Sequence, residues 1–177
     1  MSKQNAMSIN PQDTLVRIAT GNDAEAISNL WKSLSTISPY LIFEVDEIPG
    51  VMQLTRTLDS SNQDIIIVAI RRKELVGYLG VRFGALRRVR GVGILAMGVL
   101  SEHRRSGIGS KLIIEATKIS LERGLHRLEL RVDQENSEAI SLYRRHGFTE
   151  EGTAKMAALV DGRFVDKIYM AKLIGVI

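Results

Sequence analysis

The sequence predicts a mixed α/β domain, in which a sheet of about six to seven strands is flanked by four helices. Two observations support this fold class. Short β-branched or alternating apolar segments predict strands, and longer segments with apolar residues at helical spacing predict helices. The predicted order is strand, helix, helix, three strands, helix, strand, helix and two strands. Such a mixture of elements favours one sheet covered by helices.

The sequence predicts a polar N-terminal arm at residues 1–13 and a single domain at residues 14–177, whose first half contains two helices. The first helix is expected to be capped by Asn22 or Asp23, because short polar side chains satisfy the free N–H groups at a helix start. The elements expected here are a strand at 14–20, a helix at 21–35, an irregular segment at 36–50 and a helix at 51–59.

The second half begins with consecutive strands. The expected elements are strands at 64–72, 75–83 and 92–100, a helix ending near Gly124, a strand at 125–133, a helix at 136–147 and a final hairpin. Lys73–Glu74 is the expected turn between the first two strands. The strand at 92–100 is continuously apolar, which is typical of a buried central strand. Asp161-Gly162 is a strong signal for a type I′ hairpin turn.

Composition limits the class of protein. Hydrophobic residues make up 45% of the chain, which is near the globular average. The absence of cysteine excludes a disulfide framework and thiolate chemistry. The N-terminal stretch lacks the apolar core of a signal peptide, and no apolar run reaches the length of a membrane span. We therefore expect a soluble cytoplasmic protein with no membrane partner.

The charge distribution raises the question of an anionic partner. The net charge is +4, and arginines cluster at Arg71–Arg72, Arg87–Arg88–Arg90, Arg104–Arg105 and Arg144–Arg145. Such clusters attract polyanions. Aromatic residues make up only 5% of the chain and do not alternate with the arginines, which argues against a surface that stacks nucleic-acid bases. A basic nucleic-acid-binding module is kept as an alternative from another functional class.

The segment HRRSGIGSKLIIEATKISLERG, residues 103–124, joins the apolar strand to a helix through two arginines and a Gly-Ile-Gly turn. The first N–H groups of a helix have no intrahelical acceptor, and the helix dipole adds partial positive charge there. Glycine allows a ligand to approach the backbone closely. The segment therefore predicts a site for a phosphate or pyrophosphate, although a glycine turn without a ligand also fits it.

Known anion-binding loops narrow the choice. The segment lacks the first glycine of a Walker A loop. It also does not match the dinucleotide-binding pattern G-x-G-x-x-G, because position 112 is leucine. The pattern R/Q-x-x-G-x-G/A fits, with Arg104, Gly107 and Gly109 at its defining positions.

A second motif lies downstream, where Asn136, Ala139 and Tyr143 form N-x-x-A-x-x-x-Y before Gly-Phe. The two motifs together resemble the GNAT family of N-acetyltransferases, most strongly over 92–150 and in element order over about 14–173. The C-terminal hairpin resembles the amino-acid and phosphinothricin-type subgroup. The resemblance implies a mostly antiparallel mixed sheet that splays after its central strand, with acetyl-CoA as cosubstrate.

Residue by residue, the resemblance implies two groups of contacts with acetyl-CoA. Backbone groups at the edge of the central strand would pair with the pantetheine arm, and the anion turn would bind the pyrophosphate. Asn136 would contact the pantetheine region or orient the loop, and it also fits a helix N-cap. The strand and turn residues are Met97, Gly98, Val99, Arg104, Arg105, Ser106, Gly107, Ile108, Gly109 and Ser110.

The resemblance also implies the reaction, which is direct attack of a primary amine on the thioester in a ternary complex. Tyr143 matches the general acid that would protonate the leaving thiolate, and it is also expected to touch the cofactor. A core tyrosine on the inner face of its helix fits the same position. A backbone N–H near Val99 would polarise the thioester carbonyl.

The general base is left open. The central strand holds no ionisable residue, since Gly93 lies near one place where relatives carry glutamate, and Arg131 occupies a second such place. Glu44, in the irregular segment, is a candidate base and ammonium contact, although a solvated loop carboxylate explains it equally. Tyr40 is a candidate substrate contact. Water is the other candidate base.

The expected acceptor is a small-molecule primary amine, with amino acids among the candidates. An α-amine with a pKa of about 8 loses its proton more readily than a lysine amine with a pKa of about 10.4. A protein N-terminus or lysine is the alternative acceptor, and a non-catalytic acyl-CoA sensor is the alternative role. The spacing of His103, His126 and His146 predicts no metal site. A homodimer is expected by analogy with relatives.

Overall fold

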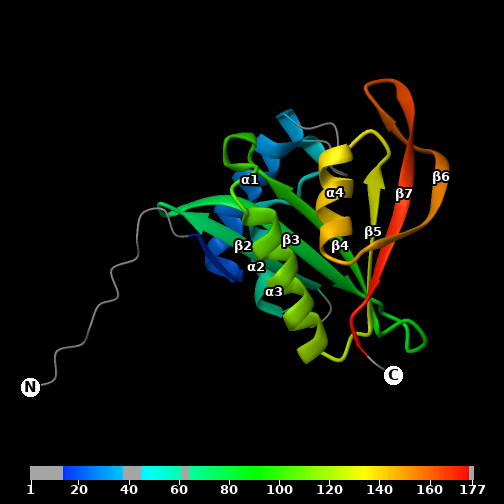
Figure 1. Cartoon of the computed structure of the whole chain (residues 1–177). Coiled ribbons are helices and arrows are strands. Elements are labelled where there is room, and N and C mark those ends of the chain that lie inside the picture. The colour runs from blue at the N-terminus through cyan, green and yellow to red at the C-terminus, as the bar shows by residue number, and fades with distance from the viewer. Residues whose placement is uncertain (1–13, 38–44, 61–63, 176–177) are drawn as a thin grey trace, which may run out of the picture.

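A seven-stranded mixed sheet forms the centre of the protein (Figure 1). The computed structural model describes residues 14–37, 45–60 and 64–175. The strands follow the order β1-β2-β3-β4-β5-β7-β6, and every neighbouring pair is antiparallel except β4 and β5. The predicted fold class, a mostly antiparallel mixed sheet with four helices, is confirmed.

The elements follow the chain order expected from the sequence. The strands are β1 (Leu15–Ile18), β2 (Asp64–Arg71), β3 (Glu74–Phe83), β4 (Val92–Val99), β5 (Arg127–Asp133), β6 (Thr149–Val160) and β7 (Arg163–Leu173). The helices are α1 (Ala24–Ile37), α2 (Val51–Ser60), α3 (Ile108–Glu122) and α4 (Ser137–Arg145). Short 3₁₀ turns lie at Gly21–Asp23, Val45–Glu47 and Ser101–His103.

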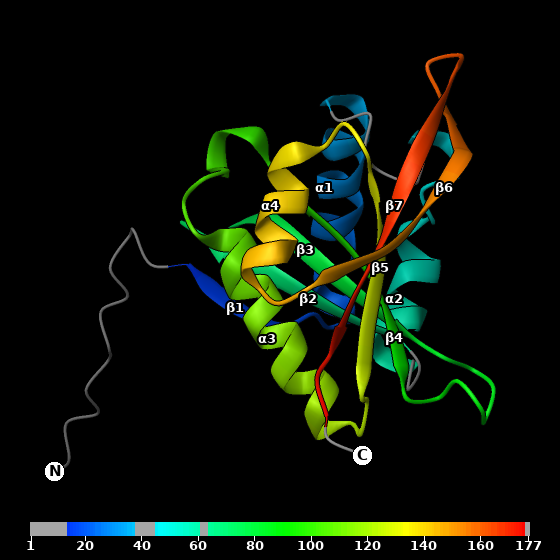
Figure 2. The same cartoon turned by 45° about the vertical axis from the view of Figure 1, so that its right-hand side comes forward.

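Helices cover the sheet from both sides, with α3 and α4 on one face and α1 and α2 on the other (Figures 1 and 2). Each face therefore has its own core. The α3 side buries Leu79, Leu112, Leu128 and Met170, and the α1 side buries Ile27, Trp31, Leu34, Val68 and Tyr78. Burial of each large aliphatic side chain contributes about 1.5–3 kcal/mol. Two covered faces explain why β2 reads as a continuous apolar run rather than an alternating one.

Two local predictions about turns and caps are wrong, and one is confirmed. The residue that caps the first helical segment is Thr20 rather than Asn22 or Asp23, because Gly21–Asp23 form a 3₁₀ turn ahead of α1. The β2–β3 turn is Arg72–Lys73, one residue earlier than expected, since Arg71 pairs with Glu74. The hairpin at Asp161-Gly162 is confirmed, and both residues have positive φ, as a type I′ turn requires.

The parallel pair β4–β5 is short. Only Val92, Gly93 and Ile94 pair with β5, opposite Arg127, Leu128 and Glu129. Beyond these residues β4 stays with β3 and β5 stays with β7, so a gap opens between them (Figure 1). The predicted splay after the central strand is therefore present.

Asp23 provides a test of local stability. Arg17 donates two hydrogen bonds to its carboxylate, at 2.7 and 2.8 Å, and the Thr20 N–H donates a third at 2.8 Å. The hydrogen bonds from Arg17, chiefly, lower the pKa of Asp23 to about 2. A carboxyl group whose pKa is depressed on folding stabilises the fold above its unfolded pKa, and that stabilisation is lost as the pH falls through the folded pKa.

We predict that Asp23→Asn lowers the free energy of unfolding by about 1–2 kcal/mol at neutral pH, and by much less at about pH 2. Asparagine keeps an oxygen acceptor for Thr20 but loses the charge that pairs with Arg17. Urea unfolding of both proteins across the acid range measures the difference. An equal loss of stability at both ends of the range would contradict the assignment.

Candidate active site

The gap between β4 and β5 exposes backbone groups at the edge of β4. The Leu100 N–H donates to the Val76 carbonyl at 3.0 Å, and the Gly84 N–H donates to the Val92 carbonyl at 3.0 Å. The N–H and C=O groups of successive residues point to opposite sides of a strand. The backbone groups of the even-numbered residues of β4 therefore bond to β3. The Gly91 carbonyl, one position before β4, accepts from His126 and Arg127 on the opposite side. It follows that odd-numbered positions face the gap.

Met97 and Val99 are consequently the positions whose backbone groups point into the gap. The Val99 carbonyl accepts a hydrogen bond from Arg104 Nε at 3.1 Å. The Val99 N–H and both backbone groups of Met97 have no strand opposite them, since β5 pairs no further than Ile94. Gly98, between them, is aligned with Tyr78 of β3.

The anion turn has the geometry of a backbone cradle. Arg105 and Gly107 both have positive φ, at 56° and 82°, and Gly107 is the N-cap of α3. Within the described part of the chain, the N–H groups of residues 106–110 donate to no backbone or side-chain acceptor, and the first helical bond there is from Lys111 to Gly107 at 3.1 Å. Successive free N–H groups at a helix start attract an anion.

The second glycine of the turn has a packing role. A Cβ on Gly109 would lie 2.8 Å from Leu142 Cδ2 and 3.3 Å from Met97 Cε. Gly109 therefore lets the start of α3 approach both α4 and β4. Gly107 differs, because a Cβ there would meet nothing within 4 Å and only its positive φ favours glycine.

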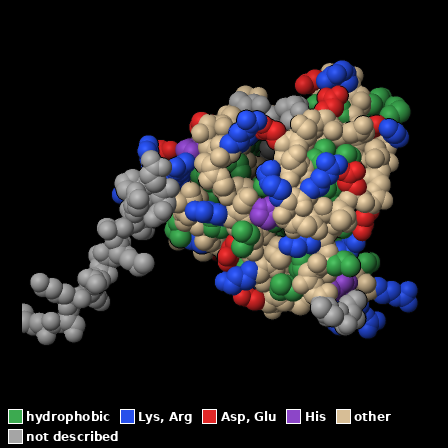
Figure 3. Space-filling view, in the orientation of Figure 1, with side chains coloured by type: hydrophobic (Ala, Val, Ile, Leu, Met, Phe, Trp, Pro, Cys, Tyr) green, Lys and Arg blue, Asp and Glu red, His purple; other side chains and the backbone are tan. Residues whose placement is uncertain are grey.

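The two arginines of the turn have separate partners. Arg104 binds the Val99 carbonyl, as above, and so links the turn to the end of β4. Arg105 is exposed and forms an ion pair with Glu138 in the first turn of α4. This pairing lowers the pKa of Glu138. Lys and Arg side chains gather on the face where α3 and α4 lie (Figure 3).

Asn136 is the N-cap of α4, one of the two roles expected for it. Its Oδ1 accepts a hydrogen bond from the Ala139 N–H at 3.1 Å. An asparagine side chain carries two further donors on its amide nitrogen. The cap therefore occupies the oxygen and leaves the nitrogen for another partner.

Tyr143 lies on the inner face of α4, 7% exposed, with its ring edge-on to Phe148 at 5.6 Å between centroids. A second tyrosine, Tyr78 of β3, packs edge-on to Trp31 on the other face of the sheet, at 5.5 Å. Burial raises the pKa of Tyr143, and interaction with Tyr78 raises it further. Burial likewise raises the pKa of Tyr78. Both phenols therefore stay protonated at neutral pH.

The sequence arguments did not single out Tyr78, which lies beside Gly98 of β4. Its position opposite Gly98 is a signal that could have revealed it, because a Cβ on Gly98 would lie 3.1 Å from Tyr78 Cε1 and 2.8 Å from Leu34 Cδ1. The glycine leaves room for the tyrosine ring beside the gap. Without the strand register, Tyr78 is indistinguishable from any core aromatic.

His146 is the residue at the C-terminal cap of α4. Its Nε2 lies 2.9 Å from Ser110 Oγ, so it joins the end of α4 to the start of α3. Burial, followed by the charges of Lys172 and Arg145, lowers its pKa. A neutral imidazole with an unprotonated Nε2 can accept a hydrogen bond from the serine hydroxyl, which orients that hydroxyl at the anion turn.

Comparison with known proteins identifies this arrangement. Residues 29–148 match the model of the Acetyltransferase (GNAT) family. The chain belongs to the GNAT family. It is 30% identical over 126 residues to the L-amino acid N-acetyltransferase of Escherichia coli strain K12, covering 71% of this chain and 70% of that protein.

Solved structures agree with the GNAT assignment. The acetyltransferase of the GNAT family from Streptococcus pneumoniae superposes with a TM-score of 0.87 and 28% identity, covering 92% of this chain and 100% of that one. A phosphinothricin acetyltransferase from Sinorhizobium meliloti, in complex with AcCoA, gives a TM-score of 0.81 at 22% identity, covering 92% and 89%. The latter shows likeness of fold.

Beyond β4, one face of the GNAT sheet carries charged side chains at the gap. Leu128, Leu130 and Val132 of β5 are buried against the α3 side. The alternate residues, Glu129 and Arg131, therefore lie on the opposite face. Tyr40 and Glu44, the predicted acceptor contacts, lie outside the described residues.

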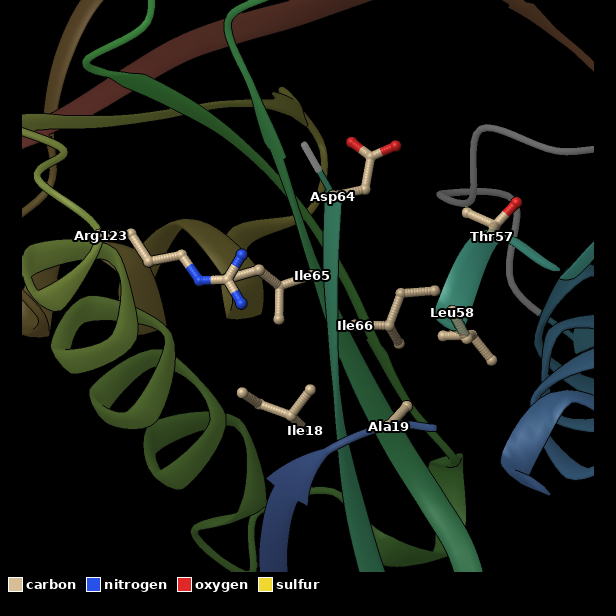
Figure 4. A pocket seen from close by; sticks show the side chains of 8 residues that line it. All are labelled: Ile18, Ala19, Thr57, Leu58, Asp64, Ile65, Ile66 and Arg123. Atoms are coloured by element: carbon tan, nitrogen blue, oxygen red, sulfur yellow. The ribbon is translucent and has the colours of Figure 1, made fainter. Parts of the chain in front are cut away.

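Hollows also lie elsewhere among the described residues. A cavity of about 70 Å³ lies among β1, β2, α2 and Arg123, at the end of the sheet remote from the anion turn (Figure 4). A larger hollow of about 320 Å³ lies between the end of β5 and the start of β7. Within residues 14–37, 45–60 and 64–175, no cluster of three His, Asp or Glu residues could hold a metal, and no helix could span a membrane.

Substitutions of the two glycines of the turn should differ in their effect on the stability of the protein. Asparagine tolerates positive φ better than other residues do, so Gly107→Asn should stay within about 1 kcal/mol of wild-type stability. Gly109→Asn should cost about 1–3 kcal/mol, because its side chain meets Leu142 and Met97 in a packed core. Urea unfolding measures both. Equal stability of the two variants would contradict the packing role of Gly109.

Proposed function

We propose that this GNAT protein transfers the acetyl group of acetyl-CoA to the primary amine of a small molecule, by direct attack in a ternary complex. The observation that supports this most is the gap between β4 and β5, edged by unpaired backbone groups and flanked by the anion turn. An extended chain can pair with such an edge, and a pyrophosphate fits the free N–H groups beside it.

Each part of acetyl-CoA has residues that fit it. The backbone of Met97 and Val99 would hold the pantetheine arm, and Gly98 would contribute by leaving space rather than by bonding. The N–H groups of Ser106, Gly107, Ile108, Gly109 and Ser110 would hold the pyrophosphate. Arg104 and Arg105 would add positive charge, although each also has a partner in the protein. The free amide nitrogen of Asn136 would reach the pantetheine region.

When bound, acetyl-CoA supplies a thioester whose acyl group a neutral amine can attack. The Val99 N–H faces the gap and is placed to stabilise negative charge on the carbonyl oxygen. Tyr143 donates its phenolic proton to the sulfur as the carbon–sulfur bond breaks. The amine forms the new amide bond and loses one proton to a base.

The raised pKa of Tyr143 bears on this role. A thiol has a pKa of about 8.5 and a phenol of about 10 in water, so proton transfer from tyrosine to a thiolate is uphill there. Burial that raises the pKa of the phenol raises that of a thiol in the same surroundings as well. Burial of Tyr143 therefore keeps the phenol protonated and leaves it able to act as an acid towards a thiolate in the same surroundings.

For the acceptor side, we keep Glu44 as candidate base and ammonium contact and Tyr40 as candidate substrate contact, with water as the other base. A protein N-terminus or lysine is the alternative acceptor. We also propose that the protein is cytoplasmic and forms a homodimer. Support for the dimer comes from apolar side chains exposed on the β6–β7 hairpin, namely Met156, Leu159 and Phe164.

Calorimetric titration with acetyl-CoA, followed by a thiol-release assay over amino acids, polyamines and peptides, tests the proposal. We expect binding of acetyl-CoA and turnover of at least one small amine. Failure to bind acetyl-CoA would refute the proposal and return attention to a nucleic-acid-binding role. Binding without turnover of any amine would favour an acyl-CoA sensor.

The two tyrosines give the sharpest test of the acid. We predict that Tyr143→Phe lowers kcat by about 10²- to 10⁴-fold and leaves the KM for acetyl-CoA nearly unchanged, whereas Tyr78→Phe keeps most of the activity. Both variants retain the ring and its packing, so thermal unfolding should confirm that each folds. The reverse ranking would transfer the acid role to Tyr78, and near-normal turnover of both would remove it from tyrosine.

The pH dependence of the reaction follows from the same residues. The rate should rise with pH as the acceptor amine loses its proton. Because the pKa of Tyr143 lies above its usual value of about 10, deprotonation of Tyr143 should cause no decline below that pH. Measurement of kcat/KM from about pH 6 to pH 9.5 tests this. A decline above about pH 8.5 that Tyr143→Phe abolishes would contradict it.

A further inference from the structure

The face of the sheet opposite Tyr143 carries an exposed cation at the gap. Arg131 of β5 lies two residues beyond Glu129, the last residue that pairs with β4. On the other side of β5, Arg131 pairs with Tyr169 of β7. Since Leu130 and Met170 are buried on the α3 side, Arg131 and Tyr169 both lie on the opposite face, where the two strands part.

Tyr169 holds Arg131 in place. The guanidinium carbon lies 4.8 Å from the centre of the Tyr169 ring. A guanidinium stacked on an aromatic face keeps its N–H groups at the rim of the ring, directed sideways in one plane. That planar array matches the two oxygens of a carboxylate. The contact with Tyr169 therefore favours one position of the guanidinium before any ligand arrives.

The neighbouring charges are already neutralised. Arg127 donates to Glu129 at 3.0 Å and to Glu151 at 2.8 Å. Lys167 donates to the buried Asp133 at 3.2 Å. In contrast, no carboxylate of the described residues forms an ion pair with Arg131. Along this row of β5, the positive charge of Arg131 is the one left for an external anion.

We propose that Arg131 binds the carboxylate of the acceptor, so that α-amino acids are the substrate class. The inference rests on the proposed function, because it requires the acceptor amine to enter the gap from the face opposite Tyr143. In an α-amino acid only one carbon separates the amine from the carboxylate. A carboxylate bound at the rim of the gap would therefore keep the amine next to the thioester.

The test combines removal of the arginine with removal of the substrate carboxylate. Wild type and Arg131→Gln are assayed with an L-amino acid and with its α-amide, and kcat/KM is measured for all four combinations. For each substrate, kcat/KM of the wild type is divided by kcat/KM of the variant. Comparing the two quotients removes the effect of the different amine pKa values of the two substrates. We expect Arg131→Gln to lower kcat/KM for the acid about 10- to 100-fold, mainly through KM, and to leave the amide nearly unchanged.

Matched variants separate recognition from folding. Tyr169→Leu removes the ring beneath Arg131 and should lose part of the preference for the acid, and Tyr169→Phe, which keeps the ring, should restore that preference. Arg88→Gln, in the exposed β3–β4 loop, removes the same charge elsewhere and should have no effect. An equal loss for acid and amide in Arg131→Gln, or no loss for either, would overturn the inference.

Failure of the proposed function is distinguishable from failure of this inference. If wild type releases no coenzyme A with any amine, transferase activity is refuted. The role of Arg131 is then decided by calorimetric titration of the same L-amino acid into wild type and Arg131→Gln. Weaker binding to the variant, with equal binding of the amide, supports the inference. Equal binding of the acid to both proteins, or no binding to either, refutes it.

Discussion

The parting of β4 and β5 after three residue pairs is the constraint on which the rest of the structure depends. Each of these strands has a longer antiparallel ladder on its other side, with seven pairs between β3 and β4 and seven between β5 and β7. Twisted sheets rotate neighbouring strands relative to each other, so the two ladders diverge. The short parallel contact ends, and the backbone groups at Met97 and Val99 are left without a strand partner.

Backbone polar groups left without partners away from water are costly, and proteins rarely leave them so. Here the Val99 carbonyl is satisfied by Arg104 from the anion turn. The same contact fixes the turn against the end of β4. Gly109 then allows α3 to pack closely against α4, and His146 joins the two helices through Ser110. The gap, the turn and α4 are thus one connected arrangement.

The two faces of the sheet carry different side chains beside the gap. On one face lie α3, α4 and the buried Tyr143, with the free N–H groups of the anion turn nearby. On the other face lie Arg131 and Tyr169 of the β5–β7 pair, together with Tyr78 of β3. Two substrates that meet in the gap would then approach from opposite sides. This separation suits direct transfer, since neither substrate has to leave before the other enters.

The sequence by itself determined the element order, the anion turn and the Asn136–Tyr143 helix, because each depends on local spacing of apolar residues, glycines and caps. It misplaced the cap of the first helical segment by two or three residues and one turn by a single residue, since a 3₁₀ turn and the strand register decided those positions. Only the tertiary structure decided which β4 groups face the gap, which side chains leave room only for glycine at positions 98 and 109, and that Tyr78 and Arg131 lie on the same face of the sheet. These facts depend on which strands pair and where they separate, and that is a long-range property with no local signal in the chain.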